Sequence, residues 1–105
     1  MIHILSAIDA VQNMLANKTL EDFSNDLLLR LAVERALEII CEASHRLPHE
    51  VKAQQKSIDW QRMIDFGNLL CHAYHRVDAQ IVFEIASRDL PPFKAFAERV
   101  IRESE

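Results

Sequence analysis

The sequence predicts an all-α fold, an up-and-down bundle of four main helices plus a short helix. Half of the 105 residues are apolar, and one glycine and three prolines leave little material for tight turns. Apolar residues also recur at three- and four-residue steps along most of the chain, which is the period of an amphipathic helix. At this length we expect a single domain over residues 1–105, with a high surface-to-volume ratio that favours association.

Charge and cysteine usage restrict the class of protein. Twelve Lys and Arg against sixteen Asp and Glu give a net charge of −4, which argues against a general coat for nucleic acid but allows a local basic patch. The two cysteines show no C-x-x-C spacing, and no apolar run approaches the roughly 20 residues that cross a bilayer. The N-terminus lacks the basic region and cleavage site of a signal peptide. We therefore expect a cytoplasmic protein without a membrane segment.

The first part of the chain predicts one long helix and one short helix. The long helix covers residues 2–16, and its inward positions are Ile4, Ile8, Val11 and Leu15. Thr19 and Asp22 have the spacing of a capping box, so a new helix begins at Leu20. The segment FSND at residues 23–26 contains three poor helix formers, and we expect a break or kink there.

The most strongly periodic segment, residues 27–47, predicts the central helix of the bundle. Its inward stripe is expected to contain Leu29, Ala32, Ala36, Ile39, Ile40, Ala43 and Leu47. Glutamates recur at four-residue steps at Glu34, Glu38 and Glu42. Paired carboxylates can serve acid–base chemistry, whereas a solvated acidic face explains the same spacing.

Residues 48–57 are expected to form a long irregular stretch, because Pro48 ends the central helix. Basic side chains gather around it: His45, Arg46, His49, Lys52 and Lys56. The stretch is interpreted either as an ordinary exposed loop or as an arm that contacts RNA phosphates, since clusters of Lys and Arg hold nucleic-acid backbone.

The next helix carries most of the side chains that can do chemistry at close range. Asp59 is its expected N-cap. One face is apolar and contains Trp60, Met63, Ile64, Gly67, Leu70, Cys71 and Tyr74, while the other contains Gln61, Asp65, Asn68, His72 and His75. Asn68 and His72 are four residues apart, so their side chains lie one above the other. An imidazole there titrates near neutral pH and can act as a general acid or base.

Metal-ligating residue types lie close together in the sequence at Cys71, His72, His75 and Asp78. On a continuous helix His72 and His75 share a side, whereas Cys71 and Asp78 point elsewhere. Because a structural zinc needs four convergent ligands, the sequence predicts neither a metal site nor a cofactor.

Two further helices complete the expected bundle. Asp78 caps a helix that ends near Arg88. Pro91 stands at the first position of the last helix, where a missing N–H is harmless. The inward face of that helix is expected to contain Phe93, Phe96, Ala97, Val100 and Ile101.

A resemblance to a known family emerges from the pattern N-x-x-x-H-x-Y, formed by Asn68, His72 and Tyr74. Together with the following Val77 and Asp78, it resembles the motif R-N-x-x-x-H-x-Y of the HEPN superfamily, and most closely that of its HepT branch.

Three other segments are similar to the same branch. The segment LEIICEA at residues 37–43 resembles the branch's LEIIGEA, IDW at residues 58–60 resembles I-P-W, and DLP at residues 89–91 resembles D-L-P. In order and spacing the resemblance covers nearly the whole chain. One departure matters for catalysis, since Gly67 stands at the position of the motif arginine.

This resemblance implies the ribonuclease toxin of a toxin–antitoxin pair whose other member is the minimal nucleotidyltransferase MntA. It implies cleavage of RNA without a metal, in which the 2′-hydroxyl attacks the neighbouring phosphate at a composite site where two motifs meet in a homodimer. The resemblance makes Asn68 and His72 the catalytic residues: Asn68 orients the site and His72 moves protons. It also implies that the partner attaches AMP to Tyr74, where added charge and bulk block the RNA phosphate.

The glycine at position 67 leaves two interpretations open. An arginine there stabilises charge that develops on the phosphate, and loss of one such group costs about 10²–10³ in rate. In one interpretation the chain is a nuclease weakened by the missing arginine, and Arg76 or Arg35 supplies a substitute phosphate contact. In the other interpretation glycine serves close helix packing, and the chain is a non-catalytic HEPN binding subunit of a nucleotidyltransferase.

Overall fold

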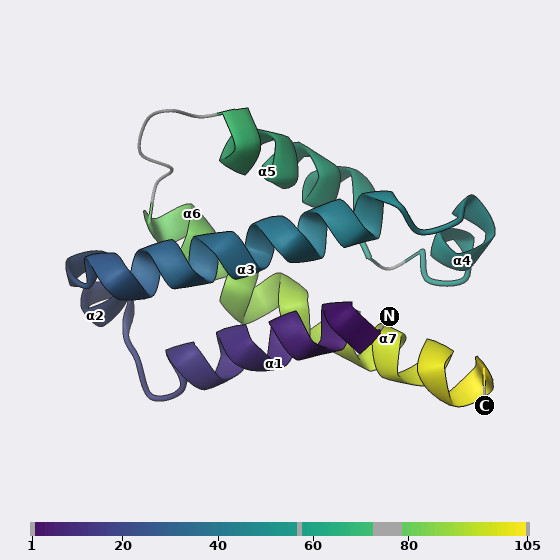
Figure 1. Cartoon of the computed structure of the whole chain (residues 1–105), viewed down its shortest axis with the longest axis horizontal. Coiled ribbons are helices and arrows are strands. Elements are labelled where there is room, and N and C mark those ends of the chain that lie inside the picture. Colours follow the sequence, from purple (N-terminus) through teal and green to yellow (C-terminus); the bar gives the residue numbers. More distant parts are fainter. Residues whose placement is uncertain (1, 57, 73–78, 105) are drawn as a thin grey trace.

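The fold is an all-α bundle with α3 at its middle (Figure 1). The computed structural model describes residues 2–56, 58–72 and 79–104, and only the backbone of residues 2, 69–72 and 104. Within these residues the helices are α1 (Ile2–Leu15), α2 (Leu20–Asn25), α3 (Leu27–His45), α4 (His49–Ala53), α5 (Trp60–His72), α6 (Ala79–Glu84), the π-helix η1 (Ile85–Asp89) and α7 (Leu90–Ser104). The predicted fold class is confirmed.

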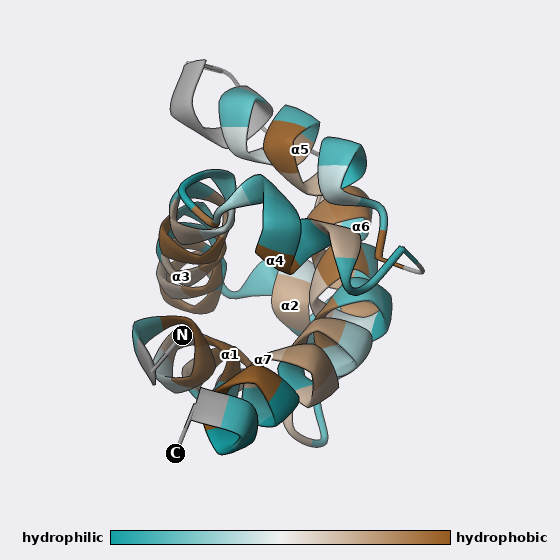
Figure 2. Cartoon of the chain, turned by 90° about the vertical axis from the view of Figure 1, so that its right-hand side faces the viewer, coloured by the Kyte–Doolittle hydropathy of each residue, from teal (hydrophilic) through white to brown (hydrophobic). Residues whose placement is uncertain are grey.

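Helix α3 divides the bundle into two sides. Helix α1 packs against one side and α5 against the other, so that Figure 1 shows α5 above α3 and α1 below it. Helix α7 and the π-helix η1 pack against α1, and α2 packs against α6. Seen along the long axis, α1 and α3 carry long hydrophobic stretches whereas α4 is largely hydrophilic (Figure 2). None of the helices in the described ranges has the length and apolar character that crossing a membrane requires.

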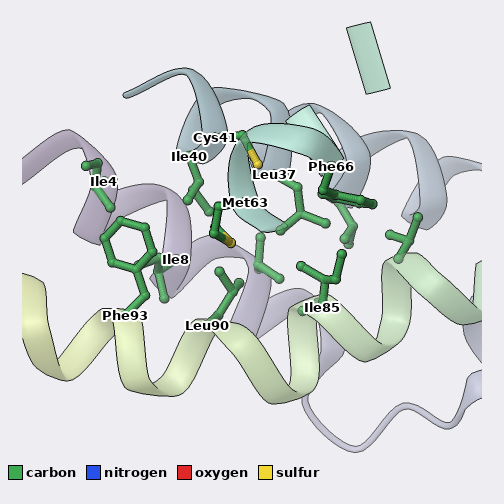
Figure 3. Packing of buried hydrophobic residues seen from close by; sticks show 14 of the residues in the cluster. Ile4, Ile8, Leu37, Ile40, Cys41, Met63, Phe66, Ile85, Leu90 and Phe93 are labelled. Atoms are coloured by element: carbon green, nitrogen blue, oxygen red, sulfur yellow. The ribbon is translucent and has the colours of Figure 1, made fainter. Parts of the chain in front are cut away.

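The hydrophobic core collects side chains from α1, α2, α3, α5 and the segment from α6 to α7, and Figure 3 shows part of it. Its fully buried members include Ile8, Val11, Phe23, Val33, Leu37, Ile40, Val82, Leu90 and Phe93. Burying one such side chain contributes about 1.5–3 kcal/mol. The inward positions predicted for α1 and α7 are confirmed at Ile4, Ile8, Val11, Phe93, Phe96 and Ala97.

Local capping sets the ends of the first two helices. Asn17 follows α1 with a φ of 62°, a left-handed conformation that asparagine tolerates and that ends a helix. The Thr19 N–H donates to Asp22 Oδ2 at 3.1 Å, and the Asp22 N–H donates to Thr19 Oγ1 at 3.1 Å. The first of these bonds lowers the pKa of the Asp22 carboxyl, because it favours the charged form. The predicted capping box is confirmed.

Asp26 forms the predicted break between α2 and α3. Its backbone is extended, with a φ of −114° and a ψ of 97°, and its N–H donates to the Phe23 carbonyl at 3.4 Å. Its Oδ1 accepts from the Leu29 N–H at 3.1 Å. One residue therefore closes α2 and caps α3.

The inward face of α3 differs from the prediction. The buried positions are Val33, Leu37, Ile40, Cys41 and Ser44. Of the predicted stripe, Ile40 is buried, several members are half-buried, and Ala32 and Ile39 are exposed. Because α3 is covered by α1 on one side and by α5 on the other, its buried surface is wide. Along the sequence, the buried positions are shifted by about one residue from the stripe that the periodicity predicted.

The predicted irregular stretch after Pro48 is wrong for residues 49–53, which form α4. Pro48 is the N-cap with a φ of −58°, and its fixed ring presets the chain for a helical turn. Glu50 lies in the first turn, where the helix dipole favours a negative charge.

The predicted end of a helix near Arg88 is also wrong. The chain continues without a break from α6 through η1 into α7, and Leu90 is helical with a φ of −71° and a ψ of −40°. Pro91 therefore lies inside a continuous helix. Neither Pro91 nor Pro92 has an N–H, so the helix lacks two backbone hydrogen-bond donors there. The wider π turn just before them changes the hydrogen-bond register, which keeps the chain helical across that gap.

Candidate functional site

A pocket of about 150 Å³ lies between α3 and α5. Its walls are Glu38, Cys41, Glu42 and His45 of α3 together with Ile64, Gly67 and Asn68 of α5. These residues recur at three- and four-residue steps on both helices, so each helix turns one continuous face to the pocket. Sequence reasoning placed Asn68 in a site but missed the wall from α3. The spacing of the glutamates and His45 places them on one face of α3, but no neighbouring residues in the sequence indicate that α5 lies beside that face.

The two helices approach closely at Gly67. A Cβ added to Gly67 would lie 2.7 Å from the Cβ of Cys41, whereas carbon atoms in contact prefer about 3.5–4.0 Å. Glycine at this position therefore permits the observed separation of α3 and α5. This geometry supports the interpretation in which Gly67 serves packing.

Asn68 is exposed at the rim of this pocket, on the polar side of α5. The helix begins as predicted, because Asp59 Oδ1 accepts from the Arg62 N–H at 2.9 Å. His72 is the last residue of α5, one turn beyond Asn68. The structure describes the backbone of His72 but not its side chain.

The α3 wall contains two carboxylates, of which Glu38 is paired with Arg35 of α3 and Glu42 with Arg46, the C-cap of α3. The Arg35 guanidinium lies 3.4 Å from Glu38 Oε1, and that of Arg46 donates to Glu42 Oε1 at 2.6 Å. Arg35, expected as a substitute phosphate contact, therefore lies next to a wall of the pocket. Its side chain is 66% exposed.

The basic segment after α3 is tied to the beginning of α5. The indole Nε1 of Trp60 donates to the carbonyl oxygens of Lys52 at 3.0 Å and Gln55 at 3.1 Å. The Lys52 ammonium donates to the His45 carbonyl at 3.4 Å. The Trp60 ring packs edge-on against Phe93 and Phe96, with centroid separations of 5.3 Å and 5.5 Å. These bonds fix the backbone at Lys52 and Gln55 against the first residue of α5.

Other predicted site residues lie outside the described part of the chain. Tyr74, His75, Arg76 and Asp78 belong to residues 73–78, and Cys71 is described by its backbone alone. Among the side chains that are described, no group of three or more His, Cys, Asp and Glu residues is arranged to hold a metal ion.

Comparison with known proteins adds a family match. The family model described as Ribonuclease HepT-like matches residues 4–100. A probable ribonuclease HepT of Thermococcus cleftensis is 34% identical over 97 residues, which are 92% of this chain and 88% of the relative. A provisionally assigned RNase of Methanocaldococcus jannaschii is 30% identical over 102 residues, which are 97% of this chain and 84% of the relative.

A further relative from the same organism is longer. It is named as a gamma-glutamylcyclotransferase and provisional RNase, and it is 31% identical over 101 residues. The match covers 96% of this chain but 46% of that relative, so the chain spans less than half of its length. No solved structure matches the chain significantly.

Proposed function

The chain belongs to the ribonuclease HepT-like family, and from this premise we propose that it is an endoribonuclease that needs no metal or cofactor. Relatives named as ribonucleases support the assignment. The proposed catalytic residues are Asn68 and His72. The observation that carries the proposal is their position, one turn apart on α5, with Asn68 at the rim of a pocket.

The proposed reaction is an internal transesterification of RNA. A base removes the proton of the 2′-hydroxyl, the 2′-oxygen attacks the adjacent phosphorus, and the bond from phosphorus to the 5′-oxygen breaks. An acid gives a proton to the leaving 5′-oxygen, so the products are a 2′,3′-cyclic phosphate and a 5′-hydroxyl. His72 suits these transfers because imidazole titrates near neutral pH. Asn68 orients the substrate through its amide.

A two-fold homodimer is part of the proposal. A single histidine serves as base and acid only in turn, whereas pairing the α5 helices about a two-fold axis brings two copies of His72 to one site. The exposed polar side of α5, with Gln61, Asp65 and Asn68, supports such a pairing because it offers groups for hydrogen bonds between copies.

The proposed biological setting is a toxin–antitoxin pair with a minimal nucleotidyltransferase as antitoxin. Tyr74 is the proposed acceptor of AMP, on the basis of the resemblance of Asn68, His72 and Tyr74 to the motif of the HepT branch. An adenylate there adds negative charge where an RNA phosphate must bind, and repulsion between like charges then silences the enzyme.

One observation favours a second function, a non-catalytic binding subunit of a nucleotidyltransferase. The contact between Gly67 and Cys41 leaves no room for an arginine at position 67 at the present helix separation. The site then lacks a group that stabilises charge on the phosphate. Arg35, beside Glu38, and Arg76 are the proposed substitutes if cleavage is retained.

Cleavage of a fluorescent RNA in the presence of a chelator tests the first function. We expect 2′,3′-cyclic phosphate ends, and a loss of about 10²–10⁴ in rate for His72→Ala. Asn68→Ala should also lower the rate, whereas His3→Ala, exposed on α1, should leave it unchanged. Cleavage that persists in His72→Ala contradicts the proposed mechanism. No cleavage by the wild-type dimer favours the binding subunit.

A further inference from the structure

Three leucines at the beginning of α3 are exposed beside an open depression in the surface. Leu28 is 79% exposed, Leu27 65% and Leu31 54%, and no other large apolar side chain in the described part of the chain is exposed to that extent. Leu31 is four positions from Leu27 and three from Leu28, so the three share one side of the helix. Leu27 and Leu28 also line the depression, which has a volume of about 560 Å³ and extends over α2 and the turn before it.

This surface lies apart from the candidate site. The depression shares no lining residue with the pocket between α3 and α5. Figure 1 shows α2 and the beginning of α3 at the end of the bundle opposite α4. A contiguous exposed apolar surface bordered by polar residues is typical of an interaction site. The leucines therefore mark a surface for a partner, and this inference goes beyond the proposed ribonuclease function.

The depression is negatively charged. Its lining contains the carboxylates of Glu21, Asp22 and Asp26 and the ammonium of Lys18, so three negative charges and one positive charge give a net charge of −2. Backbone N–H groups donate to Asp22 and Asp26, but a neutral donor leaves the charge of a carboxylate in place. The ion pairs between described residues include none of these four groups. The carboxylates are therefore available to a cationic partner.

The negative lining argues against three occupants. RNA and an anionic membrane surface carry negative charge, which this lining repels. A second copy docked about a two-fold axis through the depression would bring the same three carboxylates of both copies together, and like charges across an interface are unfavourable. The next arginines along α3 do not compensate this charge, because Arg30 and Arg35 each lie within 4.0 Å of a glutamate of their own helix.

The leucines and carboxylates together select a partner of definite chemistry. Apolar side chains of the partner would cover the leucines, and Lys or Arg at the border of those side chains would face the carboxylates. An amphipathic helix presents both kinds of group, and helices bind grooves in this way. The volume of about 560 Å³ lies within the roughly 300–1,000 Å³ of sites that hold drug-sized groups, so there is room for anchoring side chains. We propose that the depression and the three leucines bind a basic amphipathic helix of another polypeptide.

A synthetic peptide tests the proposal on the intact chain. The peptide has about 14 residues, or four helical turns, with leucine on one side and lysine on the other. Its binding is followed by NMR through backbone amide signals of the chain. We expect saturable shifts at Leu27, Leu28 and Leu31 and none at Asn68. A scrambled peptide of the same composition, and a peptide with glutamate in place of lysine, should cause no saturable shift. Absence of saturable shifts with the first peptide, or equal shifts with either control, overturns the proposal.

Matched variants test the apolar contacts. Leu28→Ala with Leu31→Ala should weaken binding of the peptide about tenfold or more, because apolar surface is no longer covered. Ile39→Ala with Ile81→Ala changes two exposed apolar side chains that do not line the depression and should leave the affinity unchanged. Thermal melting verifies that both variants are folded. Equal weakening by the two pairs would show that the peptide attaches to apolar surface in general, and it would overturn the site.

A second matched pair tests the charge. Glu21→Gln should weaken binding about two- to fivefold, which is the scale of one exposed ion pair. Glu50→Gln removes the same charge from an exposed position on α4, outside the depression, and should not change the affinity. Equal effects of the two substitutions would show attraction to the net negative chain as a whole, and the proposed docking surface would be wrong.

Two further measurements test the competing occupants. Vesicles of phosphatidylglycerol should not bind the chain, and binding that Leu28→Ala with Leu31→Ala abolishes would assign the surface to a membrane and overturn the proposal. Sedimentation equilibrium should give the same mass for the wild type and for this double variant. A lower mass of the variant would assign the surface to a second copy, which also overturns the proposal. None of these measurements involves RNA, so their outcome does not depend on the proposed function.

Discussion

The Cβ of Cys41 occupies the space that a side chain on Gly67 would need, since a Cβ at position 67 would lie 2.7 Å from it. At the present helix separation one of the two positions must be glycine. The segment LEIIGEA of the resembling branch has glycine where this chain has Cys41, and its motif has arginine where this chain has Gly67. The two departures are therefore reciprocal, and they exchange a small residue and a larger one across the same contact.

The first prediction concerns stability. Gly67→Ala should lower the unfolding free energy, because overpacking costs about 1–3 kcal/mol and exceeds the roughly 0.5–1 kcal/mol that alanine gains in a helix. In a Cys41→Gly background the same substitution should be tolerated. In a Cys41→Ala background it should still destabilise, because alanine keeps the clashing Cβ. Urea unfolding of these variants gives the coupling between the two positions, and equal effects in all backgrounds would contradict the contact.

The second prediction concerns activity. Gly67→Arg alone should destabilise the chain, whereas Cys41→Gly with Gly67→Arg restores the pattern of the resembling branch. We expect this double variant to raise RNA cleavage about 10²-fold, the scale of one donor that stabilises developing charge.

Adding His72→Ala to the double variant should abolish that gain, because residues that act as a unit are not additive. Thermal melting of each protein separates loss of folding from loss of chemistry. A stable double variant that cleaves no faster than the wild type would favour the binding subunit.

The third prediction concerns assembly. Sedimentation equilibrium at micromolar concentration should give twice the mass of the chain. Asn68→Glu places like charges near the two-fold axis of the proposed interface and should weaken the dimer. Asn13→Glu makes the same change at an exposed position of α1 and should not affect it. A strictly monomeric wild type would remove the composite site.

The fourth prediction concerns Tyr74. Incubation with ATP and a cognate minimal nucleotidyltransferase should add the mass of adenylate to this chain, and Tyr74→Phe should prevent the addition. The modified protein should lose cleavage activity through repulsion of the RNA phosphate. Peptide mass spectrometry locates the group, and attachment at another residue would rule out this assignment.

The fifth prediction concerns pH. The Thr19 N–H donates to the Asp22 carboxylate and lowers its pKa below the usual 3.8. Because the folded-state pKa lies below the unfolded one, this contribution to stability is fully present above about pH 3.8 and is lost as the pH falls through the folded-state pKa. Asp22→Asn should therefore lower the melting temperature at neutral pH, and the difference should shrink in acid.

Glu21→Gln is the matched control for that measurement, because it removes a charge from the same first turn without breaking the capping box. A difference between Asp22→Asn and wild type that stays constant into acid would show that the carboxylate form is not what stabilises the helix.

The parts of the fold that depend on a few neighbouring residues could be predicted from the sequence. The caps at Thr19 and Asp59 are examples, because each is decided within four positions. The orientation of α3 could not be predicted, since apolar residues cover most of that helix and only the places of α1 and α5 decide that Cys41 is buried and Ile39 exposed. The pocket was missed for the same reason, because it depends on the distance between two helices.

Trp60, the one tryptophan of the sequence, touches both the core and the segment beside the pocket. Its indole is thus a built-in fluorophore with two environments to report. Loss of the bonds to Lys52 and Gln55 would alter its emission while the rings of Phe93 and Phe96 still shield it, whereas global unfolding would expose it to water and shift the emission to longer wavelength. Fluorescence can therefore distinguish local opening beside the pocket from melting of the bundle, without any label added to the chain.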